Sequence, residues 1–323
     1  MSTCATASRQ LAEPLAGTAA PARTWLLVEQ PGPWGADALT TSHLDPAVGR
    51  ALDAAAEGTG VRIALIRRPG RHADCHQPGT HRVFAAHTAP GRSWIRTTAV
   101  ADPAELTRLD LAALGAGEHG GLWEAYEGDP LVFVCTNGKR DRCCALLGRP
   151  LAAELAASGA EAWEVTHIGG HRFSPTLFVL PYGYAYGRVT AHGVKDVLEA
   201  VRDRRIVTGD CRGRSAWERP AQAAELAVRE LTGEEDADAF DVTRTEGTAP
   251  HWSVTVAHTD GRAWRVAVEQ GAAEPARPES CGRAPGMPAR MDVISVTPLR
   301  TDVPAEAFAG PRPSGPGAVS RPS

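Results

Sequence analysis

The chain has 323 residues, of which 43% are hydrophobic and 22% are charged, and its formal net charge is −4. This length suggests two or three domains, and this composition permits ordinary buried cores. Basic and acidic residues alternate without a tract rich in lysine or arginine. We therefore expect neither a nucleic-acid-binding protein nor one that docks on an anionic membrane surface.

The first 22 residues contain no charged segment followed by an apolar core, so we expect no secretory signal. No apolar run approaches the roughly 20 residues needed to cross a bilayer. These features lead us to expect a cytoplasmic protein. The seven cysteines are odd in number and unevenly spaced. In a cytoplasmic chain this pattern indicates metal-binding, catalytic or buried thiols rather than a disulfide framework.

Local patterns predict an α/β fold with three ordered parts. Residues 1–22 are aperiodic and are expected to form a flexible lead-in. Residues 23–128 are then predicted to form an N-terminal α/β domain. Its expected strands cover residues 24–30, 60–68, 81–88 and 93–100, and its expected helices cover residues 43–57 and 102–111.

Residues 129–210 predict a second α/β domain. The expected order is strand, helix, strand, strand, strand, helix, which is the outline of a thioredoxin-like domain, although many other α/β domains share it. The predicted strands are residues 131–135, 162–170, 176–183 and 184–190, and the predicted helices are residues 149–159 and 194–206. Pro150 suits the first turn of its helix and Gly159 suits the end.

Residues 211–309 predict a small α+β domain. A helix is expected over residues 219–233 and a further strand over residues 292–300. The segments 251–259 and 263–271 alternate with period two on either side of Asp260–Gly261, which indicates a β-hairpin. Residues 310–323 are rich in proline, glycine and serine, and we expect a disordered tail. No internal sequence repeat is evident.

Three cysteines and two histidines stand at the ends of predicted strands. Cys135 ends a strand, Cys144 follows nine positions later, and Cys143 stands beside it. His167 and His171 flank a Gly-Gly turn at the end of the next predicted strand. Because neighbouring strands lie about 5 Å apart, two adjacent strand ends would bring these side chains together.

Thiolate and imidazole ligands suit zinc, iron–sulfur clusters or copper rather than magnesium or calcium. The spacing of the two histidines fits a structural zinc site, whereas the long interval between the cysteines does not. A long interval suits a larger object, such as a cluster with two iron ions. Spacing alone therefore leaves zinc and an iron–sulfur cluster both open.

The segments Cys-Thr-Asn-Gly-Lys-Arg-Asp-Arg-Cys-Cys, His-Ile-Gly-Gly-His-Arg-Phe and Tyr-Gly-Arg (Tyr186–Arg188) resemble the sucrase/ferredoxin-like family. The resemblance covers about residues 22–210. It implies a thioredoxin-like [2Fe–2S] ferredoxin domain whose cluster is held by Cys135, Cys144, His167 and His171. It also favours Cys144 over Cys143 as the second cysteine ligand.

The expected function is soluble one-electron transfer, with a separate and unidentified reductase as partner. We expect an electron carrier rather than a stand-alone catalyst, because no catalytic residues and no paired carboxylates are evident. Reduction could be coupled to protonation of His167 or His171, since imidazole titrates near neutral pH. Lys139, Arg140 and Arg172 flank the ligands, either as aids to reduction and partner binding or as ordinary solvated charges.

Two alternatives use the same region. One is a zinc-binding structural or interaction protein with the same four ligands. The other is a thiol–disulfide oxidoreductase that uses Cys143 or Cys144, which is disfavoured because no Cys-x-x-Cys follows the strand. A separate group, Cys75 with His72 and His76, is a weaker candidate for a second metal site. The remaining cysteines, Cys4, Cys211 and Cys281, are interpreted as structural or incidental.

Overall fold

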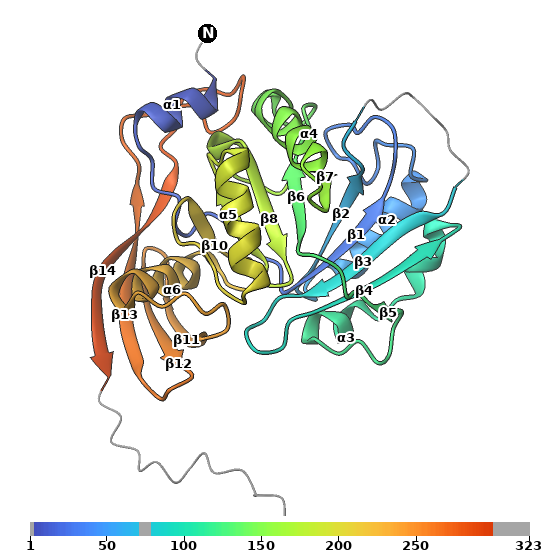
Figure 1. The fold of residues 1–323 in the computed structure, drawn as a ribbon. Coiled ribbons are helices and arrows are strands. Elements are labelled where there is room, and N and C mark those ends of the chain that lie inside the picture. The colour runs from blue at the N-terminus through green and yellow to red at the C-terminus, as the bar shows by residue number, and fades with distance from the viewer. Residues whose placement is uncertain (1–2, 71–78, 300–323) are drawn as a thin grey trace, which may run out of the picture.

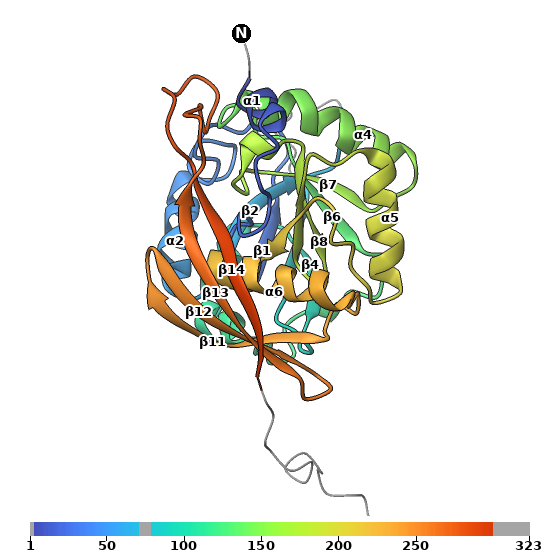
Figure 2. The ribbon, with the colours of Figure 1, turned by 90° about the vertical axis from the view of Figure 1, so that its left-hand side faces the viewer.

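The computed structural model describes residues 3–70 and 79–299. It is a mixed α/β protein with one large and one small β-sheet (Figures 1 and 2). The large sheet has ten strands in the order β10-β9-β8-β6-β7-β2-β1-β3-β4-β5. Its strands are β1 (Thr24–Glu29), β2 (Val61–Arg67), β3 (His81–His87), β4 (Trp94–Val100), β5 (Glu124–Ala125), β6 (Leu131–Cys135), β7 (Ala162–Val165), β8 (Thr176–Leu180), β9 (Tyr184–Gly187) and β10 (Cys211–Arg214).

The large sheet contains the same strand arrangement twice. In the first half-sheet (β1–β4), β1 pairs parallel with β2 and antiparallel with β3, and β3 pairs antiparallel with β4. In the second half-sheet (β6–β9), β6 pairs in the same way with β7 and β8, and β8 pairs with β9. Strands β2 and β7 join the two halves as antiparallel neighbours. Topology thus repeats although the sequence shows no repeat, because a buried strand needs only a suitable apolar pattern.

Helices cover the outer face of each half-sheet (Figure 1). The helices α2 (Pro46–Ala56) and α3 (Leu111–Ala116) pack on the first half, and α4 (Arg149–Ala157) and α5 (Ala191–Arg202) pack on the second. Two 3-10 helices, η1 (Pro103–Arg108) and η3 (His171–Phe173), and a π-helical turn, η2 (Cys144–Gly148), complete this part. The helices predicted at 43–57, 149–159 and 194–206 are confirmed, whereas the segment at 102–111 is mainly the 3-10 helix η1.

The inner faces of the two half-sheets share one aromatic core. Trp25 of the first half stacks on Phe178 of the second, with ring centroids 4.3 Å apart. Phe84 lies edge-on to Phe133 and Trp163, at 6.2 and 5.6 Å. Side chains alternate along a strand, so Leu131, Phe133 and Cys135 of β6 all face this shared core, while Val132 and Val134 face α4 and α5. The sequence of β6 thereby places Cys135 between the two halves.

A buried ion pair joins the half-sheets where β2 meets β7. Arg67 donates to Glu164 Oε2 through Nε and Nη2, at 2.8 and 2.7 Å. The Thr136 hydroxyl donates to the same carboxylate oxygen at 2.8 Å. Both charged side chains are almost fully buried. Because Thr136 directly follows Cys135, this ion pair also fixes the backbone at the end of β6.

The small sheet has the order β11-β12-β13-β14 and is packed against α6 (Arg219–Thr232). Its strands are β11 (Phe240–Thr248), β12 (His251–His258), β13 (Ala263–Ala272) and β14 (Ala289–Leu299). The predicted hairpin and helix of this region are confirmed. The strands β10 and β11 were not predicted. Strand β10 pairs with β9, so residues 211–214 extend the large sheet.

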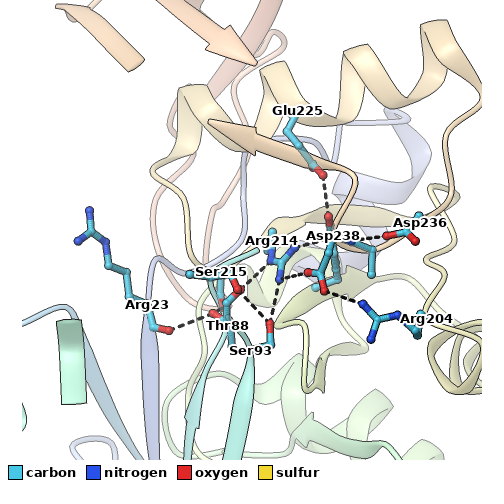
Figure 3. Close-up of polar contacts among 12 residues, drawn as sticks. Arg23, Thr88, Ser93, Arg204, Arg214, Ser215, Glu225, Asp236 and Asp238 are labelled. Atoms are coloured by element: carbon cyan, nitrogen blue, oxygen red, sulfur yellow. Dashed lines mark hydrogen bonds and ion pairs between the residues drawn. The ribbon is translucent and has the colours of Figure 1, made fainter. Parts of the chain in front are cut away.

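Arg214 links the large sheet to the C-terminal part of the chain (Figure 3). It is fully buried, and its Nε donates to the Thr88 carbonyl at 2.7 Å. Its Nη1 donates to the Ala237 carbonyl at 2.7 Å, and its Nη2 pairs with Asp238 at 3.1 Å. These contacts satisfy a charge that would be costly to bury unpaired.

Residues 3–22, here called the N-terminal strap, differ from the expected flexible lead-in. The helix α1 (Cys4–Gln10) begins the strap, with Thr3 accepting a hydrogen bond from the Thr6 N–H as its N-cap. Beyond the helix, Arg212 binds Thr18 and Gln222 binds both the N–H and the carbonyl of Ala19. Tertiary contacts of this kind order a segment that is too short and aperiodic to predict from its own sequence.

The two predicted α/β domains (23–128 and 129–210) share the ten-stranded sheet, and their boundaries remain a prediction. The predicted tail, residues 310–323, lies outside the described residues. Among the helices that the structure describes, none is long and apolar enough to cross a bilayer.

Candidate functional site

The four predicted ligands stand at the ends of β6 and β7, which are adjacent. The parallel pairing of β6 with β7 places Cys135 beside Val165, and His167 follows two residues later. Cys144 begins η2, and His171 begins η3. The condition under which the sequence would bring these side chains together, adjacent strands, is met in the structure.

Three of the four side chains form a compact group. The Sγ atoms of Cys135 and Cys144 and a ring nitrogen of His167 all lie within 4.8 Å of one another. His171 stands next to this group, with its ring centroid 5.1 Å from that of His167. The structure thus brings together Cys135, Cys144 and His167, and places the His171 ring beside that of His167.

Each imidazole ring has one buried nitrogen without a hydrogen-bond partner among the described residues. The Nδ1 atoms of His167 and His171 are buried and make no hydrogen bond to any residue within 3–70 or 79–299. The other nitrogen of His171, Nε2, lies 3.7 Å from Asp141 Oδ2. A metal-bound histidine commonly directs its second nitrogen toward a carboxylate in this way. Burial lowers the pKa of His171, although the Asp141 carboxylate partly opposes this.

The two cysteines are fully buried in the core between the half-sheets. The hydrogen bond from Cys144, aided by His167, lowers the pKa of Cys135, and the same contact raises the pKa of Cys144. The contact between the two sulfurs therefore favours the thiolate form of Cys135 over that of Cys144. Thiolates in a buried place are the form that binds iron or zinc.

Two arginines, the partly buried Arg62 and the fully buried Arg212, contact the backbone of the His167–His171 turn. Arg62 of β2 donates to the His167 carbonyl at 3.3 Å, and Arg212 of β10 donates to the Gly169 carbonyl at 3.3 Å. Burial lowers the pKa of Arg62, and it lowers that of Arg212 to about 9. Their positive charges stand near Cys135, so they favour additional negative charge at the site.

Glycine is required at two positions where the backbone passes too close to other atoms to leave room for a Cβ. Gly170 has φ +70°, and a Cβ there would collide with the Arg212 guanidinium. Gly148 lies where η2 passes the end of β6, and a Cβ would collide with the Cys135 carbonyl. These glycines let the histidine turn and the η2 segment close around the cysteines.

Cys143 points away from the predicted ligands. Its Sγ lies 3.4 Å from that of Cys4 and 3.1 Å from that of Cys281. Cys144, in contrast, is grouped with Cys135. The sequence led to the interpretation of Cys4 and Cys281 as structural or incidental, because cysteines so far apart in the chain give no local signal of their meeting.

The charged residues predicted beside the ligands have different surroundings. Lys139 and Arg140 are exposed, and Arg140 lies 3.6 Å from Asp37. Arg172 forms an ion pair of 2.7 Å with the buried Glu13 of the N-terminal strap. The candidate group of His72, Cys75 and His76 lies outside the described residues.

Comparison with known proteins gives one family and one distant relative. The family model described as sucrase/ferredoxin-like matches residues 15–213, which is more than half of the chain. The chain is also similar to "Altered inheritance of mitochondria protein 32" of Meyerozyma guilliermondii, with 26% identity over 93 residues. That match covers 25% of this chain and 33% of the relative, so the chain spans about a third of the relative's length. No solved structure matched the chain.

Proposed function

The chain belongs to the sucrase/ferredoxin-like family, and from this premise we propose that it is an electron-transfer protein with a [2Fe–2S] cluster held by Cys135, Cys144, His167 and His171. The observation that carries the proposal is the buried group formed by two thiols and an imidazole within 4.8 Å, with a second imidazole beside it. When bound, such a cluster accepts and donates a single electron.

The donor set fits a cluster of this kind. Two thiols and two imidazoles match the ligation in which histidines replace two cysteines on one iron. The buried and unpartnered Nδ1 atoms of His167 and His171 are available as ligands. The Arg62 and Arg212 guanidiniums offset negative charge near Cys135. Neutral imidazole in place of thiolate raises the reduction potential.

The surface beside the site suits a partner protein. Leu146 and Leu147 of η2 are 51% and 40% exposed, directly after the buried Cys144. Lys139, Arg140 and Arg142 are exposed on the loop that precedes it. Two exposed leucines beside exposed basic residues favour an acidic reductase as the electron donor, because complementary charges accelerate the association of two proteins.

Proton-coupled reduction is part of the proposal. An imidazole that binds iron through one nitrogen keeps a second nitrogen that can bind a proton. For His171 this is the atom that lies 3.7 Å from the Asp141 carboxylate. We expect the midpoint potential to fall as the pH rises, and a potential that is constant between about pH 6 and pH 10 would contradict this part.

The proposal is tested by purifying the protein without oxygen. The expected protein is red-brown, contains equal amounts of iron and acid-labile sulfide, and bleaches on reduction. Electron paramagnetic resonance of the reduced protein should show a mixed-valence signal that changes in His167→Cys and His171→Cys. Cys143→Ser is the matched control for Cys144→Ser and should retain its iron.

The alternative is a zinc-binding structural or interaction protein that uses the same four residues, because zinc also accepts two cysteines and two histidines. A colourless protein that loses zinc in Cys135→Ser, and shows no signal after loading with iron, would favour this alternative.

We also propose a cytoplasmic location, since the six cysteines that the structure describes are all free thiols, which suits a reducing compartment.

A further inference from the structure

Three cysteines that are distant in the sequence meet beside Asp141. Cys4 comes from α1, Cys143 from the loop before η2, and Cys281 from the connection between β13 and β14. Their Sγ atoms are separated by 3.4 Å (Cys4–Cys143), 3.5 Å (Cys4–Cys281) and 3.1 Å (Cys143–Cys281). In both ribbon views α1 lies beside the connection between β13 and β14 (Figures 1 and 2).

A buried carboxylate completes the group. Both oxygens of Asp141 lie 3.8 Å from the Cys4 sulfur. Asp141 Oδ1 accepts the Cys143 N–H at 2.8 Å, and Oδ2 accepts the Cys281 N–H at 2.8 Å and the Ser280 hydroxyl at 2.9 Å. These bonds hold the carboxylate in one orientation, as hydrogen bonds do for carboxylates that bind metals.

We propose that Cys4, Cys143 and Cys281, with Asp141, bind a single zinc ion at a second metal site, separate from the predicted [2Fe–2S] ligands. Zinc takes four ligands in tetrahedral geometry, and three thiolates with one carboxylate provide them. Zinc–sulfur bonds of about 2.3 Å separate tetrahedral sulfur ligands by about 3.8 Å. The three sulfur pairs therefore need to move apart by about 0.3 to 0.7 Å.

Zinc accounts for this group better than a disulfide does. A disulfide would join two of the sulfurs and leave the third as a buried thiol beside a carboxylate. The zinc ion instead uses all three sulfurs and neutralises part of the charge that they and Asp141 carry. Thiolate ligands also select zinc over magnesium or calcium, which prefer oxygen.

The site joins the N-terminal strap and the connection between β13 and β14 to the loop that precedes Cys144. The N-terminal strap contributes Cys4, and the connection between β13 and β14 contributes Cys281. A second link runs parallel to it, because Glu13 of the strap pairs with Arg277 of that connection at 3.0 Å and with Arg172 at 2.7 Å. Zinc binding therefore fixes the loop of Asp141 and Cys143, next to the candidate cluster.

Metal analysis of the full-length protein and single variants tests the proposal. The wild-type protein, purified with zinc in the medium, should contain one zinc ion in addition to any iron. Cys4→Ser and Cys281→Ser should lose the zinc and keep the iron. Cys211→Ser is the matched control, because this cysteine is buried in another core, and it should keep both metals. Cys135→Ser should lose the iron and keep the zinc, which separates this site from the proposed cluster.

A second measurement does not require folded variants. Alkylation of the wild-type protein followed by mass spectrometry should show Cys4, Cys143 and Cys281 protected until a zinc chelator is added. Three results would overturn the proposal: unchanged zinc in Cys4→Ser and Cys281→Ser, zinc lost in Cys135→Ser alone, or a mass lower by two hydrogens that maps to a disulfide between two of the three cysteines.

Discussion

The two half-sheets have the same strand arrangement but different side chains at equivalent positions. In the second half-sheet, the last residue paired in the parallel ladder of the first strand is Cys135, opposite Val165. The equivalent position in the first half-sheet is Glu29, opposite Ile66. Two residues beyond the second strand's partner stand His167 in one half and Arg68 in the other.

This difference shows that the strand arrangement alone does not gather thiols and imidazoles at the strand ends. Both halves bury similar strands and carry helices on their outer faces, yet thiols and imidazoles gather at the strand ends of one half only within the described residues. The shared frame positions the strand ends, and the residues on the following loops determine the chemistry. The first half still contributes, because Arg62 of β2 contacts the His167 carbonyl.

The largest expected effect comes from removing a proposed cluster ligand from the second half-sheet. The equivalent position of the first half-sheet provides the control. Cys135→Ser should lower bound iron by at least about tenfold, since losing even an indirect partner of a metal ligand costs that much. Glu29→Gln should leave the iron content unchanged. Iron analysis after anaerobic purification measures both, and equal iron in the two variants would break the comparison.

The ion pair between the halves should give the next largest effect. Glu164→Leu leaves Arg67 buried without its carboxylate and should lower the free energy of unfolding by about 3–5 kcal/mol. The double variant Arg67→Met/Glu164→Leu should recover most of this loss, because it removes both charges. Urea unfolding measures the difference, and a double variant as unstable as the single one would refute the argument.

His87 should give the first half-sheet a pH-dependent stability. Burial, together with Arg92, Arg23 and Arg214, lowers the pKa of His87 to about 4. The ordinary value in an unfolded chain is about 6.5, so the unfolded state binds more protons between these two pH values. The free energy of unfolding should therefore fall as the pH falls from about 6.5 to 4.

Urea unfolding across this pH range measures the effect of His87→Gln, which should flatten the slope. His192→Gln is the matched control, because the His192 side chain is 89% exposed, and it should keep the wild-type slope. The same slope in His87→Gln and in the wild type would count against His87 as the group responsible.

Arg62 should connect the halves electrostatically. Arg62→Gln removes a partly buried positive charge near Cys135 and should make the midpoint potential of the proposed cluster more negative, on the order of tens of millivolts. The control is Arg68→Gln, whose side chain is 56% exposed and stacks on Trp163. Redox titration compares the variants, and identical potentials would show that the first half does not influence the site.

The smallest effect is expected at the exposed ion pair between Arg140 and Asp37. These side chains are 49% and 78% exposed, at a separation of 3.6 Å. Asp37→Asn should change the free energy of unfolding by no more than about 0.5 kcal/mol, because exposed pairs are screened by solvent. A larger change in urea unfolding would mean that this loop contact holds the halves together.

The strands and the family could be predicted from local sequence. Apolar runs such as residues 131–135 predict buried strands, and this strand is confirmed as β6. Membership of the sucrase/ferredoxin-like family is confirmed over residues 15–213. The ligand set is a different matter: its residues converge, but the bound cluster stays a proposal.

Contacts between distant segments could not be predicted. The strap's order depends on Arg212 and Gln222, about two hundred residues away in the sequence. The repeated topology could not be predicted, because two copies of a strand arrangement need to share only an apolar pattern and not identical residues. The meeting of Cys4 with Cys281 spans 277 positions, and nothing in either local sequence marks the other.

The strap also has a consequence for biosynthesis. A ribosome releases the amino end first, so Cys4 and Glu13 emerge long before Cys281 and Arg277 exist. Cys281 and Arg277 are translated only when the described residues are nearly complete. The strap can dock earlier on Arg172, Arg212 and Gln222, whereas the cysteine group stays incomplete, with the Cys4 thiol open to oxidants, until Cys281 is made. A nascent chain that stalls before residue 273 would therefore carry a folded large sheet and a docked strap, but no third cysteine beside Cys4 and Cys143.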